Sequence, residues 1–260
     1  MTDASKVVAI TGAAGGLGLA LAKRFRRDGH RIVAIDRDAE ALRQMAAAVA
    51  ADAKVCDIVD EAACLRLAAE TGPVDLLINN AGITHFGRFE TSAPSVVRHV
   101  MDVNFQGAVN MTAAYLPGLI AKQGALAAIA SVAGFAPLYG RTAYAASKHA
   151  MFGFFSTLAT EVADRGVHVL IACPSFIATQ ATTRSAGQSS EGIARPGSAG
   201  QTAGKPLSPD DVADAIADGL ARKRRLLPIG RLARLSYWVS RLAPAFYEKS
   251  MLRRMRAEIG

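Results

Sequence analysis

Three side chains near the middle of the chain have the types and the spacing that proton transfer requires. Tyr144 and Lys148 are four residues apart, and Ser131 lies thirteen residues before the tyrosine. Residues four apart on a helix share one face, so a helix here would place the phenol beside the ammonium. A neighbouring cation favours the charged form of a phenol and lowers its pKa. Such a tyrosine can exchange a proton with an alcohol or a carbonyl near neutral pH.

A glycine-rich turn near the N-terminus supplies a second observation, which matters because many amphipathic helices carry Tyr and Lys at this spacing by chance. The apolar run 6–11 leads into Gly12, Gly15, Gly16 and Gly18, and residues 19–25 then have a helical pattern. Strand, glycine turn and helix form the context of a dinucleotide-binding fingerprint. The turn lets the backbone approach a pyrophosphate, and the helix offers its unpaired N–H groups. The spacing is Gly-x-x-x-Gly-x-Gly rather than the commoner Gly-x-Gly-x-x-Gly, and a turn used only for packing is the alternative.

A carboxylate ends the second predicted strand, residues 31–36. Asp36 at this position can accept hydrogen bonds from the two ribose hydroxyls and repels a 2′-phosphate, which favours NAD. Arg37 beside it weakens that inference, because a guanidinium can pair with the 2′-phosphate of NADP. We therefore expect NAD as the cofactor, with NADP as the alternative.

Six elements in a fixed order resemble the short-chain dehydrogenase/reductase family. They are Thr11-Gly12-x-x-x-Gly16-x-Gly18, Asn79-Asn80-Ala81-Gly82, Asn104, Ser131, Tyr144-x-x-x-Lys148 and Pro174-Ser175-x-x-x-Thr179. The resemblance extends from residue 6 to about residue 230. Residues 145–156 are similar to branches of the family that act on steroids, retinoids and other lipid alcohols.

The resemblance implies four catalytic residues. Tyr144 would be the general acid in carbonyl reduction and the base in alcohol oxidation, and Ser131 would hold the substrate oxygen. Lys148 would lower the pKa of the tyrosine and hydrogen-bond the nicotinamide ribose. Asn104 matches the family asparagine that holds a water in a proton relay to the lysine. The implied cofactor contacts are those of Thr11, Gly12, Gly16, Leu17, Gly18, Asp36, Arg37, Asp57, Ile58, Asn80, Ala81, Gly82, Tyr144, Lys148, Pro174 and Thr179.

One position departs from the family pattern. The family usually carries Pro-Gly where this chain has Pro174 and Ser175. A serine there would be strained if the backbone needed a positive φ. We expect a slightly shifted loop and normal cofactor binding.

Alternating strands and helices predict the fold. Strand-like runs recur at residues 6–11, 31–36, 54–57, 74–80, 125–131, 167–174 and 225–229, and helical stretches at 39–50, 61–71, 93–121, 143–164 and 209–222. This alternation argues for a parallel sheet covered on both faces. We predict an α/β fold with a single Rossmann-type doubly wound sheet of about seven strands, occupying residues 1–230. A chain of 260 residues suits one such domain.

Composition indicates the cellular compartment in which the protein works. No apolar stretch reaches the roughly 18 residues that suggest a membrane span. The first five residues are polar and acidic, which disfavours a secretion signal. The three cysteines, Cys56, Cys64 and Cys173, are expected to be buried reduced thiols rather than disulfide partners or metal ligands. These features favour the cytoplasm.

Two segments outside the motifs differ from the rest in composition. Residues 180–206 are rich in Ala, Gly, Ser and Thr, and the resemblance implies a lid over the substrate there, disordered until a ligand binds. Residues 222–260 hold 11 Lys and Arg against 2 Asp and Glu, whereas residues 1–221 have a net charge of −1. The basic character of the protein therefore comes from its C-terminal part.

Residues 231–260 form a basic amphipathic extension. Apolar residues recur there at helical spacing until Pro244 interrupts the run; they are Leu232, Leu235, Trp238, Val239 and Leu242. Such a helix favours a membrane surface or a partner helix. The alternative is a helix that packs its apolar stripe on the domain or on a neighbouring subunit. Nucleic-acid binding is disfavoured, because the aromatic residues belong to the apolar stripe.

The substrate is the least constrained part of the prediction. The pocket candidates are mostly apolar and include His85, Phe86, Phe135, Tyr139 and Phe176. With the basic extension, they favour a lipophilic secondary alcohol or ketone. A reductase of 3-oxoacyl thioesters on an acidic carrier is the alternative enzyme, and a dinucleotide-binding protein without turnover is disfavoured by the complete catalytic set. The resemblance also implies a homodimer or homotetramer that uses the helices containing Asn104 and Tyr144.

Overall fold

A computed structural model of the chain describes residues 5–178 and 206–259, with side chains up to residue 253. Thr179 and nearly all of the predicted lid at 180–206 therefore lie outside the described residues.

Seven strands form one parallel sheet in the order β3-β2-β1-β4-β5-β6-β7. The strands are β1 (Val7–Thr11), β2 (Arg31–Asp36), β3 (Asp52–Val55), β4 (Leu76–Asn79), β5 (Ala125–Ile129), β6 (His168–Pro174) and β7 (Leu226–Ile229). The chain builds outward from β1 to β3 and then returns to the other side of β1 with β4. This reversal creates the switch point at which open α/β sheets bind their ligands. The predicted doubly wound sheet is confirmed.

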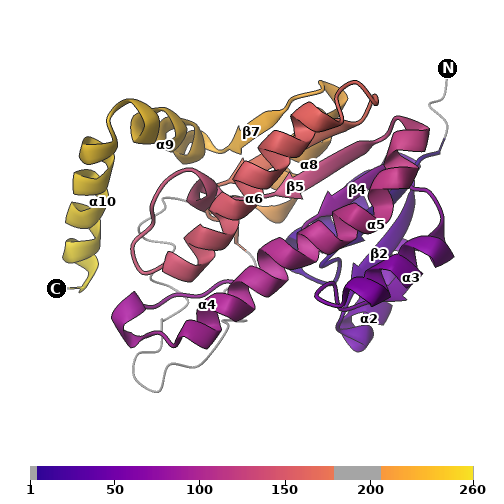
Figure 1. Cartoon of the computed structure of the whole chain (residues 1–260), viewed down its shortest axis with the longest axis horizontal. Coiled ribbons are helices and arrows are strands. Elements are labelled where there is room, and N and C mark those ends of the chain that lie inside the picture. Colours follow the sequence, from indigo (N-terminus) through magenta and orange to yellow (C-terminus); the bar gives the residue numbers. More distant parts are fainter. Residues whose placement is uncertain (1–4, 179–205, 260) are drawn as a thin grey trace.

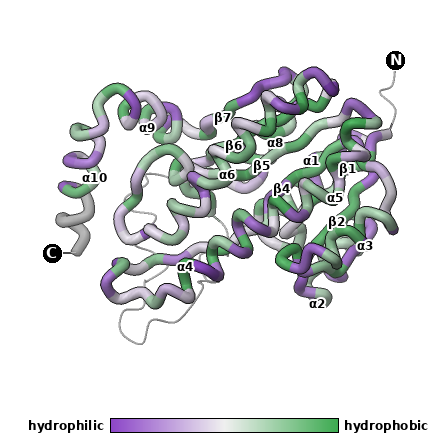
Figure 2. The backbone as a smooth tube through the Cα atoms, viewed as in Figure 1, coloured by the Kyte–Doolittle hydropathy of each residue, from purple (hydrophilic) through white to green (hydrophobic). Residues whose placement is uncertain are grey.

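Helices cover both faces of the sheet (Figure 1). On one face lie α1 (Gly16–Arg27), α2 (Ala39–Val49) and α8 (Pro209–Ala221), and on the other lie α3 (Glu61–Thr71), α5 (Gly107–Lys122) and α6 (Thr142–Glu161). Alternate residues of a strand point to opposite faces. Ala9 of β1 accordingly belongs to the core beneath α5 and α6, while Val8 and Ile10 belong to the core beneath α1 and α8. Figure 2 shows the hydrophobic residues concentrated along the strands and the adjoining helix faces.

The helical stretch predicted at 93–121 is confirmed, but it is not one regular helix. The structure has α4 (Pro94–Met101), a π-helical turn over Asp102–Gln106, and then α5. A π turn inserts one extra residue and so changes the face on which the following side chains lie. Asn104 lies in this turn, fully buried, with its amide hydrogen-bonded to a loop and to another helix. Those hydrogen bonds account for the departure from a regular helix.

Two helices follow β7 and form the C-terminal extension, α9 (Arg231–Leu242) and α10 (Pro244–Ile259), with the predicted break at Pro244. Helix α9 packs back on the domain through the buried residues Ala233 and Ser236. The Tyr237 ring meets the Phe135 ring edge-on, with the centroids 5.2 Å apart. Short 3₁₀ turns occupy Phe89–Thr91 and Val132–Gly134. Within residues 5–178 and 206–259, no helix has the length and apolar character needed to cross a bilayer.

Candidate active site

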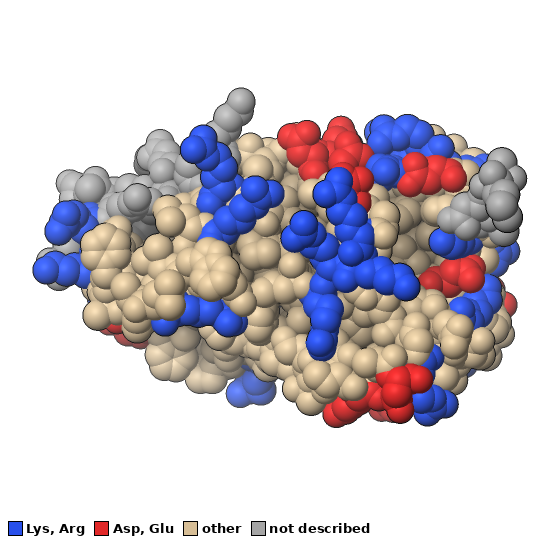
Figure 3. Space-filling view, turned by 90° about the horizontal axis from the view of Figure 1, so that it is seen from above, with Lys and Arg blue, Asp and Glu red and all other residues tan. Residues whose placement is uncertain are grey.

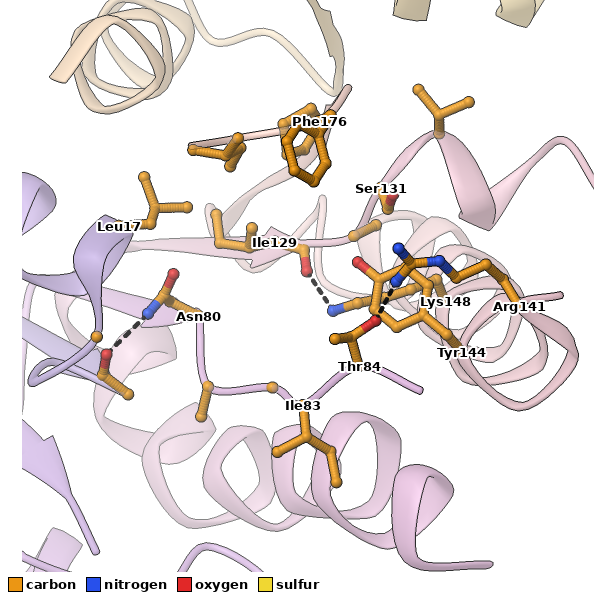
Figure 4. Close-up of a pocket in the computed structure, with 18 of the residues that line it drawn as sticks. Leu17, Asn80, Ile83, Thr84, Ile129, Ser131, Arg141, Tyr144, Lys148 and Phe176 are labelled. Atoms are coloured by element: carbon orange, nitrogen blue, oxygen red, sulfur yellow. Dashed lines mark hydrogen bonds between the residues drawn. The ribbon is translucent and has the colours of Figure 1, made fainter. Parts of the chain in front are cut away.

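A cavity of about 980 Å³ lies beyond the carboxyl ends of the strands. Residues at the ends of β1, β2, β4, β5 and β6 line it, and so does the beginning of α6 (Figure 4). The parallel sheet brings these strand ends to one edge, so residues that are far apart in sequence share one cavity.

Ser131, Tyr144 and Lys148 meet at one end of this cavity. Ser131 follows β5 and caps the next 3₁₀ turn, its Oγ accepting the Ala133 N–H at 3.2 Å. The Ser131 hydroxyl also hydrogen-bonds the Tyr144 phenol. The Lys148 ammonium donates to the Ile129 carbonyl at 2.8 Å and lies 5.8 Å from the centroid of the Tyr144 ring. The helical spacing predicted from the sequence therefore places phenol, hydroxyl and ammonium together.

The electrostatics of this group differ from the prediction. Burial raises the pKa of Tyr144, while the Ser131 hydrogen bond and the positive charge of Arg141 act in the opposite direction. Burial also lowers the pKa of Lys148 to about 8. We expected Lys148 to lower the pKa of Tyr144, but its ammonium is directed at the Ile129 carbonyl. Arg141 is a second cation beside the phenol, 6.0 Å from the ring centroid, and its charge opposes the rise of the Tyr144 pKa.

Asn104 lies behind the cavity wall rather than on it. Its Oδ1 accepts the Ile83 N–H at 2.7 Å, and its Nδ2 donates to the Ile83 carbonyl at 3.0 Å and to Ser147 Oγ at 2.9 Å. The side chain thus holds the loop after β4 against α6. Its contact with a relay water stays a prediction.

The glycine turn at the start of α1 has the shape that a diphosphate requires. Gly12 has φ +63°, and a Cβ there would lie 2.7 Å from the Ala81 Cα. A Cβ on Gly18 would lie 2.7 Å from the Ala13 Cα and would also overlap the Gly12 carbonyl oxygen. The N–H groups of the first helical turn have no helical acceptor and adjoin the cavity. The residues present therefore fit a dinucleotide pyrophosphate.

Thr11 supports this turn from beneath. Its Oγ1 accepts the backbone N–H groups of Asn80 and Ala81, each at 3.0 Å. Asn80 Nδ2 donates in return to the carbonyls of Thr11 and Gly12, at 2.9 and 3.1 Å. Thr11 is buried and does not line the cavity. It therefore differs from the other described cofactor candidates: its role is to hold the glycine turn to the loop after β4.

The opposite end of the cavity presents Asp36 at the end of β2. Its two carboxylate oxygens accept the N–H groups of Ala14 and Asp38, each at 3.1 Å. These bonds fix the carboxylate and leave further lone pairs for ribose hydroxyls. The remaining cofactor candidates line the same cavity; they are Gly12, Gly16, Leu17, Gly18, Arg37, Asp57, Ile58, Asn80, Ala81, Gly82, Tyr144, Lys148 and Pro174.

Ser175 is not strained. The non-glycine residues with positive φ, among those described, are Ala50, Gln123 and Lys223. Instead, Gly230 across from it has φ +93°, and a Cβ on Gly230 would lie 2.9 Å from Ser175 Oγ. The serine is accommodated because the facing residue has no side chain.

The five predicted substrate-pocket residues divide into two groups. Phe86, Tyr139 and Phe176 line the cavity. His85 is buried outside it, with its ring against Gly87, and burial lowers its pKa. Phe135 packs between Phe152 and Tyr237, at the junction of α6 and α9. His85 and Phe135 are therefore wrong as wall residues, because local sequence does not determine which side of a loop faces a cavity.

Sequence reasoning missed two parts of the wall. The first is the C-terminal extension, whose wall residues are Leu232, Leu235, Ser236, Val239, Phe246, Tyr247, Ser250 and Met251. The second is Arg141, three residues before Tyr144, with Thr84 beside it. Its place three residues before Tyr144, the predicted proton donor, was a visible signal for Arg141. The helical apolar pattern of residues 232–242 indicated a buried face but not what that face would cover.

Comparisons with known proteins agree with this geometry. The family model described as short chain dehydrogenase matches residues 6–189. Dehydrogenase/reductase SDR family member 7B of Bos taurus is 35% identical over 97% of this chain and 82% of its own. The crystal structure of a short-chain dehydrogenase from Streptomyces avermitilis is 29% identical, with a TM-score of 0.81 over 98% of both chains. A short-chain dehydrogenase/reductase from Burkholderia phymatum, solved in complex with NAD, is 26% identical with a TM-score of 0.76 over 86% of this chain and 88% of its own.

Proposed function

The chain belongs to the short-chain dehydrogenase family and is therefore an oxidoreductase that uses NAD or NADP, and from this premise we propose that it interconverts a lipophilic secondary alcohol and its ketone. The observation that carries the proposal is the Ser131–Tyr144–Lys148 group at one end of a large cavity with a glycine turn and Asp36 at the other.

We propose NAD as the preferred cofactor. The carboxylate of Asp36 is held by two backbone N–H groups at the end of β2, where ribose hydroxyls are bound in this type of fold. A 2′-phosphate would meet this fixed negative charge. Arg37 lines the same region, so replacing Asp36 with Ser should shift the preference toward NADP, measured as the ratio of kcat/KM values.

The dinucleotide supplies or accepts the hydride when it is bound. The chain's own residues handle the proton. Ser131 donates a hydrogen bond to the substrate oxygen and keeps it against the Tyr144 hydroxyl. Tyr144 gives its proton to that oxygen in reduction and takes it back in oxidation. Lys148 lies beside the phenol, and its pKa, which burial lowers to about 8, suits it to pass the proton onward.

The apolar wall of the cavity supports a lipophilic substrate. Leu232, Val239 and Met251 of the C-terminal extension line the cavity together with Leu138 and Phe176 of the domain. Pockets for apolar ligands have this character, with a few polar groups that fix orientation. The polar groups here are those of the catalytic end.

Replacing Tyr144 with Phe tests the proposal. Loss of the hydroxyl should reduce kcat at least a thousandfold, because the proton donor is gone while the ring that fills the site remains. The dissociation constant for NADH, measured by fluorescence, should change less than threefold. Turnover by the variant within tenfold of the parent, on any lipophilic alcohol or ketone oxidised or reduced by the parent, would contradict the assigned role.

We also propose that the C-terminal extension contacts a membrane surface. Leu235, Trp238, Leu242 and Phe246 are each more than 60% exposed. Figure 3 shows Lys and Arg side chains around an uncharged area on the side of the molecule that carries the extension. Apolar side chains flanked by cations suit an anionic bilayer. Leu235 and Phe246 also line the cavity, which would give a lipophilic substrate a route from the bilayer to the site.

Sedimentation with vesicles tests the membrane contact. The intact protein should sediment with phosphatidylglycerol vesicles at low salt, and less at high salt. The fluorescence of Trp238, the one tryptophan of the chain, should shift to the blue on binding. A variant with Trp238 and Leu242 both changed to Ser should stay in solution. Failure of the intact protein to sediment at low salt would end the proposal.

A homodimer or homotetramer remains part of the proposal. Ala146 and Gly153 of α6 are exposed small residues, and a Cβ on Gly153 would meet nothing within 4 Å. A second copy can approach such a surface closely. Light scattering should give a mass of two or four chains, and Gly153→Arg should reduce it.

A further inference from the structure

Arg141 is a cation in the cavity wall without an acidic partner among the described residues. It is half-buried at the N-terminal end of α6. Its guanidinium donates to Thr84 Oγ1 and lies 5.3 Å from the centroid of the Phe86 ring and 6.0 Å from that of Tyr144. Figure 4 shows this side chain extending over Tyr144 toward Thr84.

Five other arginines among the described residues lie within 4 Å of a carboxylate oxygen. Arg24 pairs with Asp28 and Asp214, and Arg88 pairs with Glu90. Arg141 has instead a pKa that burial lowers, with Tyr144 as the one group that raises it. A guanidinium carries five N–H donors, so the bond to Thr84 leaves most of them for another acceptor. A cation taken out of water is costly unless an anion and hydrogen bonds compensate it.

The groups around Arg141 make this end of the cavity positive. Lys148 is buried beyond Tyr144 and adds positive charge below its pKa of about 8, whereas His85, whose pKa burial and Arg141 lower, adds none near pH 7. Helix α6 begins at Thr142 and has no acidic residue in its first turn, so its dipole adds to the positive potential. An anion would be bound here, next to the reacting carbon.

The position of Arg141 indicates that this anion belongs to the substrate and not to the cofactor. The cofactor phosphates belong with the glycine turn of α1, at the other end of the cavity. Arg141 stands instead beside Tyr144, and the apolar wall of α9 and α10 lines the same cavity. One ligand can satisfy both surfaces if it has an anionic head and an apolar chain.

We propose that Arg141 and Thr84 form an oxyanion subsite that binds a carboxylate or phosphate of the substrate. This inference rests on the proposed function and deepens it: the substrate is an anionic amphiphile whose alcohol or ketone carbon lies a few bonds from the anionic group. The fork of donors on Arg141 suits either oxyanion.

Equilibrium binding tests the subsite without turnover. Octanoate, octyl phosphate and the neutral octanamide are titrated into the full-length protein saturated with NAD, by calorimetry. We expect the better of the two anions to bind at least tenfold tighter than octanamide, and the ratio between the anions tells carboxylate from phosphate. Arg141→Gln should remove the preference, and Arg141→Lys should retain part of it. Arg88→Gln, which changes an exposed arginine outside the cavity, should keep it whole.

Two results would overturn the subsite. One is equal affinity for octanamide and both anions in the parent protein, and the other is an anion preference that survives Arg141→Gln. Failure of the proposed function looks different. If Tyr144→Phe left turnover intact, the dehydrogenase mechanism would be lost, while the binding preference for octanoate or octyl phosphate would still report on Arg141.

Discussion

The two ends of the cavity are built in different ways. The cofactor end is made mainly of backbone, namely the glycine turn and the loop that Thr11 and Asn80 hold, together with one side chain, the Asp36 carboxylate, which two N–H groups fix. The substrate end is made of side chains from α6, the loop after β4 and the C-terminal extension. Backbone sites tolerate almost no substitution, whereas a wall of side chains can change its occupant without changing the fold.

The largest expected effect is at the cofactor end. Gly18→Ala would place a Cβ 2.7 Å from the Ala13 Cα and against the Gly12 carbonyl, so the turn must open. We expect the dissociation constant for NADH to rise at least a hundredfold and the melting temperature to fall by several degrees. Fluorescence titration and thermal melts measure both. Gly153→Ala, on an open face of α6, is the control: it should leave NADH binding unchanged and should not lower the melting temperature, since alanine favours the helix. Normal NADH binding by Gly18→Ala would mean that the turn is not a rigid backbone site.

Lys148 lies beside Tyr144 at the substrate end, and its burial makes stability depend on pH. Its pKa falls from 10.5 to about 8 on folding. Between these values the unfolded chain binds more protons than the folded chain, so the free energy of unfolding rises with pH. This residue should contribute an increase of about 2 kcal/mol between pH 7.5 and 9.5 without cofactor.

Lys148→Met removes that contribution and also abolishes turnover. Urea unfolding of both proteins at several pH values isolates the effect, because the other titrating groups are common to the two. The difference in free energy of unfolding should shift by about 2 kcal/mol in favour of the wild type as pH rises from 7.5 to 9.5. Parallel curves for the two proteins would show that the ammonium is not desolvated.

A smaller effect is expected where the chain departs from the family's Pro-Gly pattern. Gly230→Ala adds a Cβ 2.9 Å from Ser175 Oγ at a residue with φ +93°. We expect a loss of about 2 kcal/mol of stability in urea unfolding. Adding Ser175→Gly should recover about half, since it removes the contact but leaves the strained φ. An equal loss in both backgrounds would show that the two residues do not compensate each other.

The contrast between the two ends also describes what the sequence can reveal. Local patterns predicted the strands to within a few residues, because all of them except β3 are mainly apolar runs that end near a glycine, an asparagine, a serine or a carboxylate. The glycine turn and Asp36 were predictable for the same reason. Tyr144 and Lys148 were predictable because helical spacing alone brings them together.

What could not be predicted depends on packing between distant segments. The π-helical turn at Asn104 forms around hydrogen bonds to Ile83 and Ser147, which are 21 and 43 residues away in the chain. His85 and Phe135 follow strand ends, as wall residues do, but neither lines the cavity, and Phe135 packs against Phe152 and Tyr237 instead. The C-terminal extension lines the cavity because of where α9 packs on the domain. Its amphipathic pattern does not predict that place, since the pattern is the same for a helix that covers a domain, a membrane or a subunit.

The smallest expected effect concerns that wall. Leu235 and Leu242 are exposed leucines of the same helix, but only Leu235 lines the cavity. Because Leu235 is 62% exposed, Leu235→Ser should remove about 1 kcal/mol of apolar contact, raising KM about fivefold for a long-chain substrate. The KM for a short-chain analogue and the affinity for NADH should stay constant, since neither reaches α9. Leu242→Ser has the same chemistry and should leave every KM unchanged in detergent-free solution without vesicles. If both variants raised KM equally, the extension would act on the site through its general packing. If only Leu235→Ser raises KM, α9 is part of the substrate end and sets the length of the substrate chain that the enzyme accepts.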